Sequence, residues 1–270
     1  MSFRTTKVTV TGVAGRMGGR ILSLLLNEVG VEIVGATERE GHDYLGVDLG
    51  RVIGMPDINV LVSDNIVTAA SEADAIIDFT IPQATLRNAE YASLTAKPMV
   101  IGTTGFSAEE HSELEKLTNG FPCVISPNMS IGINVIFEIT KKLAEHLGND
   151  FDIEIIEAHH NKKIDSPSGT ALRLGEIIAD ATGRDFNKVA RFERYGQIGQ
   201  RVRDEIGLLS IRGGDIVGEH TVLFCGIGER VELTHRASTR DNFAMGAIRA
   251  LKWIVGKPPG IYTMKDVLGL

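Results

Sequence analysis

Several residue types are scarce in this chain of 270 residues, and each scarcity excludes a class of protein. Cysteine occurs only at Cys123 and Cys225, too little for a disulfide-stapled scaffold, and a chain of this length can bury a core without staples. Both cysteines lie in apolar, strand-like runs, so we expect two buried, reduced thiols. The alternative that the sequence leaves open is a bridge between them.

Long apolar runs and an excess of positive charge are also missing. No apolar run could span a membrane, and the one near the N-terminus is interrupted by Gly12 and Arg16, so we expect neither a membrane helix nor a signal peptide. Lysine and arginine number 28 against 35 aspartates and glutamates, a net charge of −7. This balance argues against binding to nucleic acid or to a membrane surface, and we expect a cytoplasmic protein.

Glycine, in contrast, is abundant. Thirty of the 270 residues are glycine, well above the usual share of about 7%. The glycines do not repeat as Gly-x-y, which excludes collagen, and an apolar content of 43% excludes a disordered chain. The positions of the glycines therefore become informative.

Strand and helix signals alternate over the first 127 residues. Helical patterns are present at 16–29, 82–95 and 107–118, and apolar or β-branched runs predict strands at 7–12, 31–37, 58–62, 75–80, 98–104 and 122–126. Continuous apolar strands that alternate with helices are typical of a parallel sheet covered on both faces. The predicted fold class is therefore α/β, a Rossmann-like doubly wound domain with ligand sites at the carboxyl ends of its strands.

The pattern changes after about residue 130, which indicates a second domain. Helices are expected at 131–147, 170–182 and 241–255, and strands at 151–160, 206–212, 216–224 and 230–238. Short glycine-containing connections join the last three strands, which predicts an antiparallel meander. We expect an α+β domain with a mainly antiparallel sheet.

A glycine-rich turn follows the first predicted strand and opens a helix. Its glycines stand at 12, 15 and 18 in the run Gly12, Val13, Ala14, Gly15, Arg16, Met17, Gly18. Glycine lets the backbone approach a pyrophosphate, whose charge meets free N–H groups at the start of the helix. The motif is a displaced relative of the dinucleotide fingerprint, although any tight strand-to-helix turn also needs glycine.

An acidic residue after the second strand supports the dinucleotide interpretation. Glu38 lies 20 residues beyond Gly18, where such folds place the acid that binds a ribose 2′-hydroxyl. Arg39 follows at once and could pair with the 2′-phosphate of NADP, so the pair suggests a site for NADH or NADPH. The alternative is a solvated charged run.

Two further strand ends carry small or hydrogen-bonding groups where nicotinamide and ribose would lie. Each could also be an ordinary turn. Their residues are Gly102, Thr103 and Thr104, and Ser126, Pro127, Asn128 and Met129.

The densest group of reactive side chains follows the strand at 151–160. His159 and His160 end this strand, and Lys163 follows in the next loop. A histidine titrates near neutrality and can deliver a proton, and a lysine suits an anionic substrate or a protonated imine. The N–H groups of Gly169 and Thr170 open the next helix and can hold a carboxylate.

Two other interpretations of this segment remain open. Ser168 could simply cap the helix beside a solvated basic loop. Glu157, His159 and His160 could bind a metal, but adjacent strand histidines diverge and no cysteine is near, so we expect no metal.

At these residues the sequence resembles the dihydrodipicolinate reductase family, also called 4-hydroxy-tetrahydrodipicolinate reductases. The stretch at 154–171 is the most specific. The matching stretches are GVAGRMG (12–18), IDFT (77–80), VIGTTGF (100–106), SPNMSIGIN (126–134), EIIEAHHNKKIDSPSGTA (154–171), RGGDIVGEHTVLF (212–224) and GERVELTHRASTRDNFAMGA (228–247).

The resemblance implies NAD(P)H-dependent reduction of a small cyclic dicarboxylate to tetrahydrodipicolinate, in diaminopimelate and lysine synthesis. It implies a dinucleotide-binding domain at 1–130 and 240–270, a substrate-binding and oligomerisation domain at 131–239, and a homotetramer.

The resemblance also implies roles for individual residues. It makes His159 the proton donor and acceptor and Lys163 a second proton donor, with His160, Gly169 and Thr170 on the substrate. It places 12–17, Glu38, Arg39, 102–104 and 126–129 on the cofactor. Two departures are small: Ala14 stands where many members have glycine, and Met129 replaces an aromatic residue found in some members.

Rival functions fit the residues less well. Another small NAD(P)-dependent imine or semialdehyde reductase would share most of these features. A thioester-type semialdehyde dehydrogenase needs a nucleophilic cysteine near a histidine, and neither Cys123 nor Cys225 has that setting. A dinucleotide-sensing regulator would need a DNA- or partner-binding module, which the sequence does not suggest, and would leave the segment at 159–170 unexplained.

Overall fold

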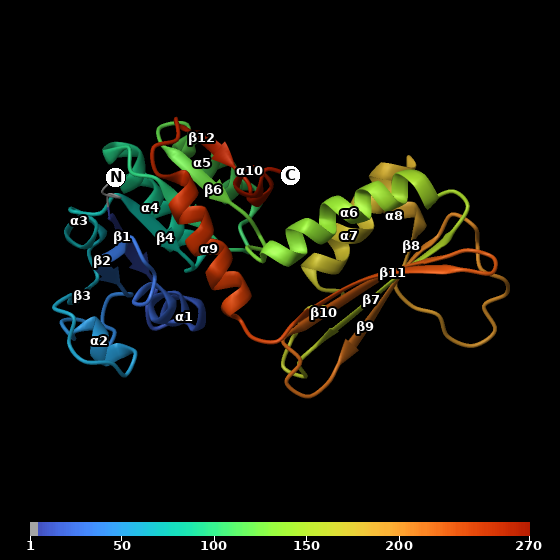
Figure 1. The fold of residues 1–270 in the computed structure, drawn as a ribbon, viewed down its shortest axis with the longest axis horizontal. Coiled ribbons are helices and arrows are strands. Elements are labelled where there is room, and N and C mark those ends of the chain that lie inside the picture. Colours follow the sequence, from blue (N-terminus) through green and yellow to red (C-terminus); the bar gives the residue numbers. More distant parts are fainter. Residues whose placement is uncertain (1–4) are drawn as a thin grey trace. The chain divides into compact units, whose positions relative to one another are not determined.

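The computed structural model of the chain describes residues 5–270 and divides into two compact units (Figure 1). Unit 1 comprises the described residues up to Ile131 together with Arg240–Leu270, and unit 2 comprises Gly132–Thr239. The chain therefore leaves unit 1, builds the whole of unit 2 and returns to complete unit 1.

Unit 1 contains a seven-stranded sheet in which every neighbouring pair is parallel. Its order is β12-β6-β5-β4-β1-β2-β3, which is the doubly wound order with one strand added at the β6 edge. The strands are β1 (Thr6–Thr11), β2 (Val31–Thr37), β3 (Val62–Ser63), β4 (Ala75–Asp78), β5 (Met99–Ile101), β6 (Pro122–Ile125) and β12 (Gly260–Tyr262).

Helices cover both faces of this sheet, as the apolar strand runs predicted. Ile77 of β4 belongs to a core cluster with α1 and α9, whereas Ile76 belongs to a second cluster with α4 and α5. Successive strand residues point to opposite faces, so both faces are buried and the predicted α/β fold class is confirmed. The helices are α1 (Arg16–Leu25), α2 (Leu49–Val52), α3 (Ile66–Ala69), α4 (Pro82–Thr95), α5 (Ala108–Thr118), α9 (Asp241–Ile254) and α10 (Met264–Leu268).

Two strands of unit 1 differ from expectation. The run at 58–62 was expected to be a strand, but β3 begins only at Val62, because the preceding segment folds back on itself. There Leu49 N donates to Val60 O at 2.8 Å and Ile58 N donates to the Asp48 carboxylate at 2.9 Å. Strand β12 was not predicted, since three residues are too few to show a period.

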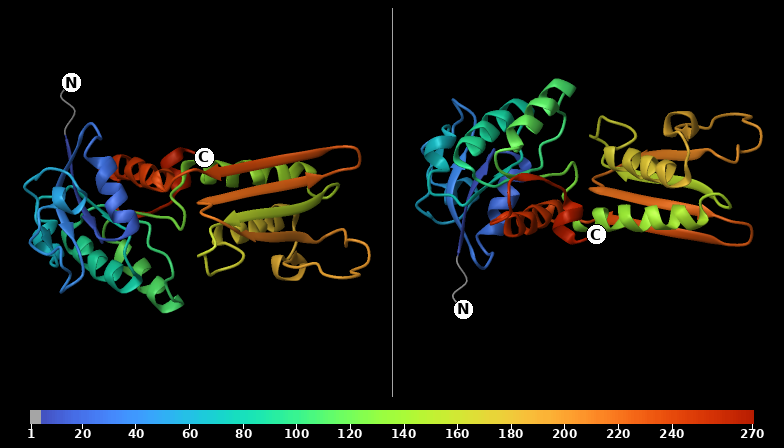
Figure 2. Two further views of the ribbon diagram at one scale, coloured as in Figure 1. Left: turned by 90° about the horizontal axis from the view of Figure 1, so that it is seen from below. Right: turned by 90° about the horizontal axis from the view of Figure 1, so that it is seen from above.

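Unit 2 places two helices on one face of a five-stranded sheet (Figures 1 and 2). The apolar residues Ile153 and Ile155 of β7 pack with the helices in one core cluster. The elements are α6 (Ile131–Leu147), whose first residue belongs to unit 1, β7 (Asp152–His159), α7 (Gly169–Thr182), α8 (Phe186–Val189), β8 (Ala190–Arg191), β9 (Ile206–Arg212), β10 (Gly218–Cys225) and β11 (Arg230–Ala237).

The sheet of unit 2 is mixed: β10 pairs antiparallel with β11 and with β7, but the expected meander through β9 is wrong. Its order is β11-β10-β7-β9-β8, and β9 pairs in parallel with β7 rather than with β10. The connection after β9 crosses the end of β7, where Gly213 N donates to His159 O at 2.9 Å and Asn161 N donates to Gly214 O at 3.2 Å. Only β10 and β11 form the expected hairpin.

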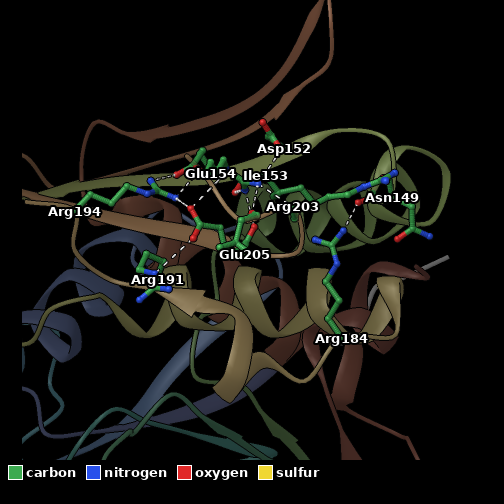
Figure 3. Close-up of polar contacts among 12 residues, drawn as sticks. Asn149, Asp152, Ile153, Glu154, Arg184, Arg191, Arg194, Arg203 and Glu205 are labelled. Atoms are coloured by element: carbon green, nitrogen blue, oxygen red, sulfur yellow. Dashed lines mark hydrogen bonds and ion pairs between the residues drawn. The ribbon is translucent and has the colours of Figure 1, made fainter. Parts of the chain in front are cut away.

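An ion-pair cluster fastens the long segment between β8 and β9 to the sheet (Figure 3). Arg194 donates to both carboxylate oxygens of Glu154 at 2.7 and 2.8 Å, and to Glu205 at 2.7 Å. Arg201 donates to Glu154 at 3.0 Å and to Asp152 at 2.8 Å. Glu154 is an even-numbered residue of β7, so the cluster lies on the sheet face opposite to Ile153 and Ile155.

Both cysteines are free. Cys123 is buried in unit 1 as expected, whereas Cys225 in unit 2 is only partly buried. Within residues 5–270, no helix has the length and apolar character needed to cross a membrane.

Candidate active site

The glycine-rich turn of unit 1 lies between β1 and α1, beside the point where the strand order reverses. Gly12 adopts a positive φ of 68°, and a β-carbon there would lie 2.8 Å from a methyl carbon of Thr80. A β-carbon on Gly18 would lie 2.2 Å from the Gly12 carbonyl oxygen. Glycine at both positions lets α1 begin close against the turn, with no side-chain cap at Gly15. The first N–H groups of α1 are thus suited to an anion.

Glu38 contacts this turn directly. Its carboxylate accepts a hydrogen bond from Ala14 N at 2.8 Å and another from Arg39 N at 3.0 Å. The structure therefore brings the predicted ribose-binding acid onto the predicted phosphate-binding turn, across 24 residues of sequence. Arg39 is exposed beside them.

A buried carboxylate, which the sequence analysis did not single out, anchors the next strand end. Asp78 is fully buried and accepts from the hydroxyls of Thr80 at 2.7 Å, Thr85 at 3.0 Å and Thr103 at 3.0 Å, and from the amide of Asn88 at 2.6 Å. Thr103, a predicted cofactor residue, is thereby fixed. The sequence signal for this network is a single feature: Asp78 ends an apolar strand, in the run IDFT.

The remaining predicted cofactor residues lie after β5 and β6. A β-carbon on Gly102 would lie 2.1 Å from the Phe79 ring, so this turn needs glycine. Ser126 Oγ donates to Asn128 O at 2.8 Å, which makes the second turn compact. The side chain of Met129 is 2% exposed and belongs to the core, so it is not available to a ligand in this structure.

All of these turns follow carboxyl ends of parallel strands, so the structure gathers them along one edge of the sheet. They are the predicted cofactor residues 12–17, Glu38, Arg39, 102–104 and 126–129.

In unit 2 the helix-covered face of the sheet changes from apolar to polar along β7. Ile153 and Ile155 are followed on that face by Glu157 and His159. In the strand register His220 of β10 pairs with Glu157, so these side chains share one face. Ser210 of β9 and His235 of β11 extend the same row. This polar end is built by four strands together.

Glu157 is the centre of this polar end. It is 1% exposed and accepts from His159 Nδ1 at 2.5 Å and from both Arg212 Nη atoms at 2.8 and 2.7 Å. Burial raises the pKa of Glu157, but the hydrogen bonds from His159 and Arg212 outweigh burial and hold this pKa well below its usual range. Glu157 is therefore a carboxylate at every physiological pH. From the sequence alone, Glu157 stands out only as a possible metal ligand.

His220 is a second buried group that the sequence analysis missed. Its ring stands edge-on to that of His159, with centroids 5.2 Å apart, and its Nε2 lies 3.1 Å from Ser168 Oγ. Burial, together with the nearby charge of His159, lowers the pKa of His220 to about 3, so this ring is neutral near pH 7.

The loop after β7 returns to the same place. Lys163 Nζ donates to the Asp165 carboxylate at 2.8 Å, and Arg212 Nη2 donates to Asp165 O at 2.7 Å. The structure thus ties the loop that carries Lys163 to the guanidinium that also binds Glu157.

The start of α7 lies against the polar end. Ser168 N donates to Glu157 Oε1 at 3.2 Å, and Ser168 Oγ accepts from Ala171 N at 3.2 Å. Gly169 is exposed, and no neighbouring heavy atom lies within 4 Å of the place where its β-carbon would stand. The opening N–H groups of this 14-residue helix can accept an anionic ligand. Thr170 follows Gly169 in this helix start, and His160 follows His159 at the end of β7; each is half-buried.

A doubly wound unit with a glycine turn, joined in one chain to a unit where a histidine pairs with a buried carboxylate beside a helix start, is the arrangement expected of a dinucleotide-dependent oxidoreductase. Residues 6–129 match the family model "Dihydrodipicolinate reductase, N-terminus" and residues 132–268 match "Dihydrodipicolinate reductase, C-terminus". The chain therefore belongs to the dihydrodipicolinate reductase family.

Individual relatives agree with this family. Proteins named 4-hydroxy-tetrahydrodipicolinate reductase from Geotalea daltonii and Geobacter sulfurreducens are each 52% identical to this chain, and the matches cover 98% of it and 99% of each relative. A dipicolinate-bound dihydrodipicolinate reductase from a Paenisporosarcina species has the same fold, with a TM-score of 0.77 and 23% identity over 97% of this chain and 98% of that one. The predicted resemblance to the dihydrodipicolinate reductase family is confirmed. The alternative of another small NAD(P)-dependent imine or semialdehyde reductase is not favoured.

Proposed function

We propose that the chain catalyses the NAD(P)H-dependent reduction of 4-hydroxy-tetrahydrodipicolinate to tetrahydrodipicolinate, a step of diaminopimelate and lysine synthesis. The observation that carries the proposal is the pairing of His159 with Glu157 beside the start of α7, in a chain of this family. This arrangement supplies a proton donor next to a place for a carboxylate, which the reduction of an anionic imine requires.

Unit 1 is the proposed cofactor-binding unit. Its fit is supported by the turn at Gly12 and Gly18, where any β-carbon would meet neighbouring atoms, and by the uncapped start of α1. Glu38 would bind a ribose hydroxyl and Arg39 a 2′-phosphate, so both NADH and NADPH are proposed cofactors. When bound, the reduced nicotinamide supplies the hydride. The turns at 102–104 and 126–129 would hold its ribose and ring.

Unit 2 is the proposed substrate-binding unit. His159 is the proposed proton donor and acceptor, and Lys163, held by Asp165, is the proposed second donor. His160 and the backbone N–H groups of Gly169 and Thr170 would bind the substrate carboxylates. Hydride transfer further requires the two bound ligands to meet during the reaction.

A homotetramer in the cytoplasm is the proposed state of the enzyme. The sheet face of unit 2 opposite to α6 and α7 supports it, because Leu209 and Ile211 on that face are exposed. Apolar side chains left on an open sheet face suit a second copy of the chain.

The direct test is a reduction assay with enzymatically generated substrate, in which loss of reduced nicotinamide is followed with NADH and NADPH in turn. Turnover with either cofactor is expected. If neither is oxidised above the background without enzyme, the proposed reaction is excluded.

A further inference from the structure

Glu157 has a contact set that the proposed reaction does not use directly. Its two oxygens receive four hydrogen bonds, from His159 Nδ1 at 2.5 Å, Arg212 Nη1 and Nη2 at 2.8 and 2.7 Å, and Ser168 N at 3.2 Å. A buried carboxylate needs such partners, because an unpaired one would be strongly destabilising. The arrangement joins β7, β9 and α7 at one carboxylate.

The donor set determines where the proton of His159 lies. An ionised carboxylate can only accept hydrogen bonds, so the proton between Glu157 and His159 belongs to Nδ1. The second ring nitrogen, Nε2, faces Gly218 of β10, and a β-carbon there would lie only 3.0 Å from it. The absence of a side chain at Gly218 thus leaves space beside Nε2.

We propose that Glu157, held by Arg212, is the positioning residue of His159, and that it leaves Nε2 as the nitrogen that exchanges protons with the substrate. The inference rests on the proposed acid–base role of His159. In the step, the Nε2–H bond of the imidazolium breaks and the proton passes to the substrate. The neutral ring keeps the proton on Nδ1, where it stays hydrogen-bonded to Glu157. A proton from solvent later restores the Nε2–H bond.

The charges around His159 make Glu157 important for the imidazolium. Glu157 is the carboxylate that contacts the ring directly, whereas the carboxylate of Asp165 pairs with Lys163. Other titratable or charged groups at this end of unit 2 are Arg212 on β9, His220 on β10, His235 on β11, and His160, Lys162, Lys163 and Asp165 after β7, together with Asp215 before β10 and the ion pair of Glu219 with Arg236. Without the charge of Glu157, the imidazolium would stand next to the Arg212 cation and lose its stabilising partner.

The test substitution is Glu157→Gln, and the contacts predict its geometry. Each oxygen of Glu157 has two donors, but both donors of Oε1, Ser168 N and Arg212 Nη2, always carry a proton, whereas at Oε2 the donor His159 can move its proton to Nε2 and only Arg212 Nη1 cannot. The amide oxygen is therefore expected at the Oε1 position. The amide NH2 would then face His159 and donate to Nδ1, which moves the ring proton to Nε2. We expect kcat to fall by roughly 10- to 1,000-fold, with KM for substrate within about two-fold.

Two readouts separate positioning from mere structural support. The ring nitrogens of His159 are read by ¹⁵N NMR of histidine-labelled enzyme without ligands, with the signals assigned through His159→Gln. Wild type is expected to carry its proton on Nδ1 above the ring's titration, and the Glu157→Gln variant on Nε2. The alkaline limb of the kcat profile should also move to lower pH by about one unit, because the imidazolium loses its contacting anion.

The controls are a matched variant and a rescue. Glu154→Gln removes a carboxylate with a two-pronged arginine contact from the opposite face of the same strand, so it should change stability but not the ring proton or the pH profile. Glu157→Asp keeps the charge and should recover part of kcat together with the original pH limb.

An unchanged ring proton in Glu157→Gln, or an equal pH shift in Glu154→Gln, would overturn the inference. The NMR result does not depend on turnover. If His159→Gln kept full activity while Glu157 still controlled the ring proton, the proposed role of His159 would fail and the positioning contact would stand.

Discussion

Ser168 Oγ lies 3.1 Å from Nε2 of His220, so the residue that caps α7 also contacts a buried histidine of β10. The backbone N–H of Ser168 donates at the same time to Glu157 on β7. The start of α7 is therefore held against two strands of the sheet. The start of α7 is thus fixed to the same carboxylate that contacts His159.

Substitution of Ser168 should test this contact. Ser168→Ala removes the cap and one partner of His220, so we expect a loss of ~1–2 kcal/mol in the free energy of unfolding. KM for the substrate should rise more than kcat falls, because the helix start binds a carboxylate rather than moving a proton. Urea denaturation and steady-state kinetics measure the two effects. Ser107→Ala, at the capping box of α5 in unit 1, is the matched control and should lower stability with no change in KM. A pure kcat effect in Ser168→Ala would contradict this role.

The proton-donor roles predict a separation of turnover from cofactor binding. His159→Gln and Lys163→Ala should each lower kcat by about 100-fold or more, because general acid catalysis is lost. The Kd for NADH should stay within about two-fold, since the proposed cofactor residues belong to unit 1. Calorimetric titration and steady-state assays measure these quantities. Lys162→Ala, at an exposed neighbouring lysine, is the control. Near-normal turnover in both site variants would refute the assigned roles.

Arg39 is expected to discriminate between the two cofactors. It is exposed beside Glu38, which itself contacts the glycine turn. Arg39→Gln should raise the Kd for NADPH by roughly 10- to 100-fold and change that for NADH little, because only NADPH carries a 2′-phosphate to pair with arginine. Arg87→Gln, at an exposed position in α4, is the matched control. Equal losses for the two cofactors would exclude the 2′-phosphate contact.

The elements that could be predicted from the sequence are those with a strong local signal. Helix α4 occupies Pro82–Thr95, as the pattern at 82–95 predicted, because a proline at its first turn marks the start and a helical pattern follows. The sequence predicts β9 correctly as a strand but indicates β10 as its neighbour, whereas β9 pairs with β7. Its partner β7 is distant in sequence, and the glycines after β9 resemble a hairpin turn although they cross the end of β7.

Long-range strand pairing also limits what the sequence can predict about the candidate site. His159 could be singled out because a histidine pair after an alternating strand is unusual and chemically informative. The contact between Arg212 and Glu157 could not be predicted, because Arg212 lies 55 residues away and reaches Glu157 only through the pairing of β7 with β9. A buried carboxylate is recognised by the donors that surround it, and long-range strand register determines those donors.

His220 predicts a pH dependence of stability that is separate from catalysis. Burial lowers its folded-state pKa from 6.5 to about 3, so below pH 6.5 the unfolded chain binds a proton that the folded chain does not. The contribution of this histidine is therefore fully present above pH 6.5 and is lost progressively as the pH falls toward 3, by up to several kcal/mol.

In His220→Gln this dependence should disappear. We expect the free energy of unfolding of wild type, from urea denaturation at a series of pH values, to fall more steeply between pH 6.5 and 4 than that of the variant, because glutamine takes up no proton. His146→Gln, at an exposed histidine in the last turn of α6, is the control and should keep the wild-type slope. The variant will be less stable at neutral pH, since a buried hydrogen-bonding group is altered, so the slope and not the absolute stability is the measured quantity. Equal slopes for wild type and His220→Gln would mean that this ring is protonated within the folded protein.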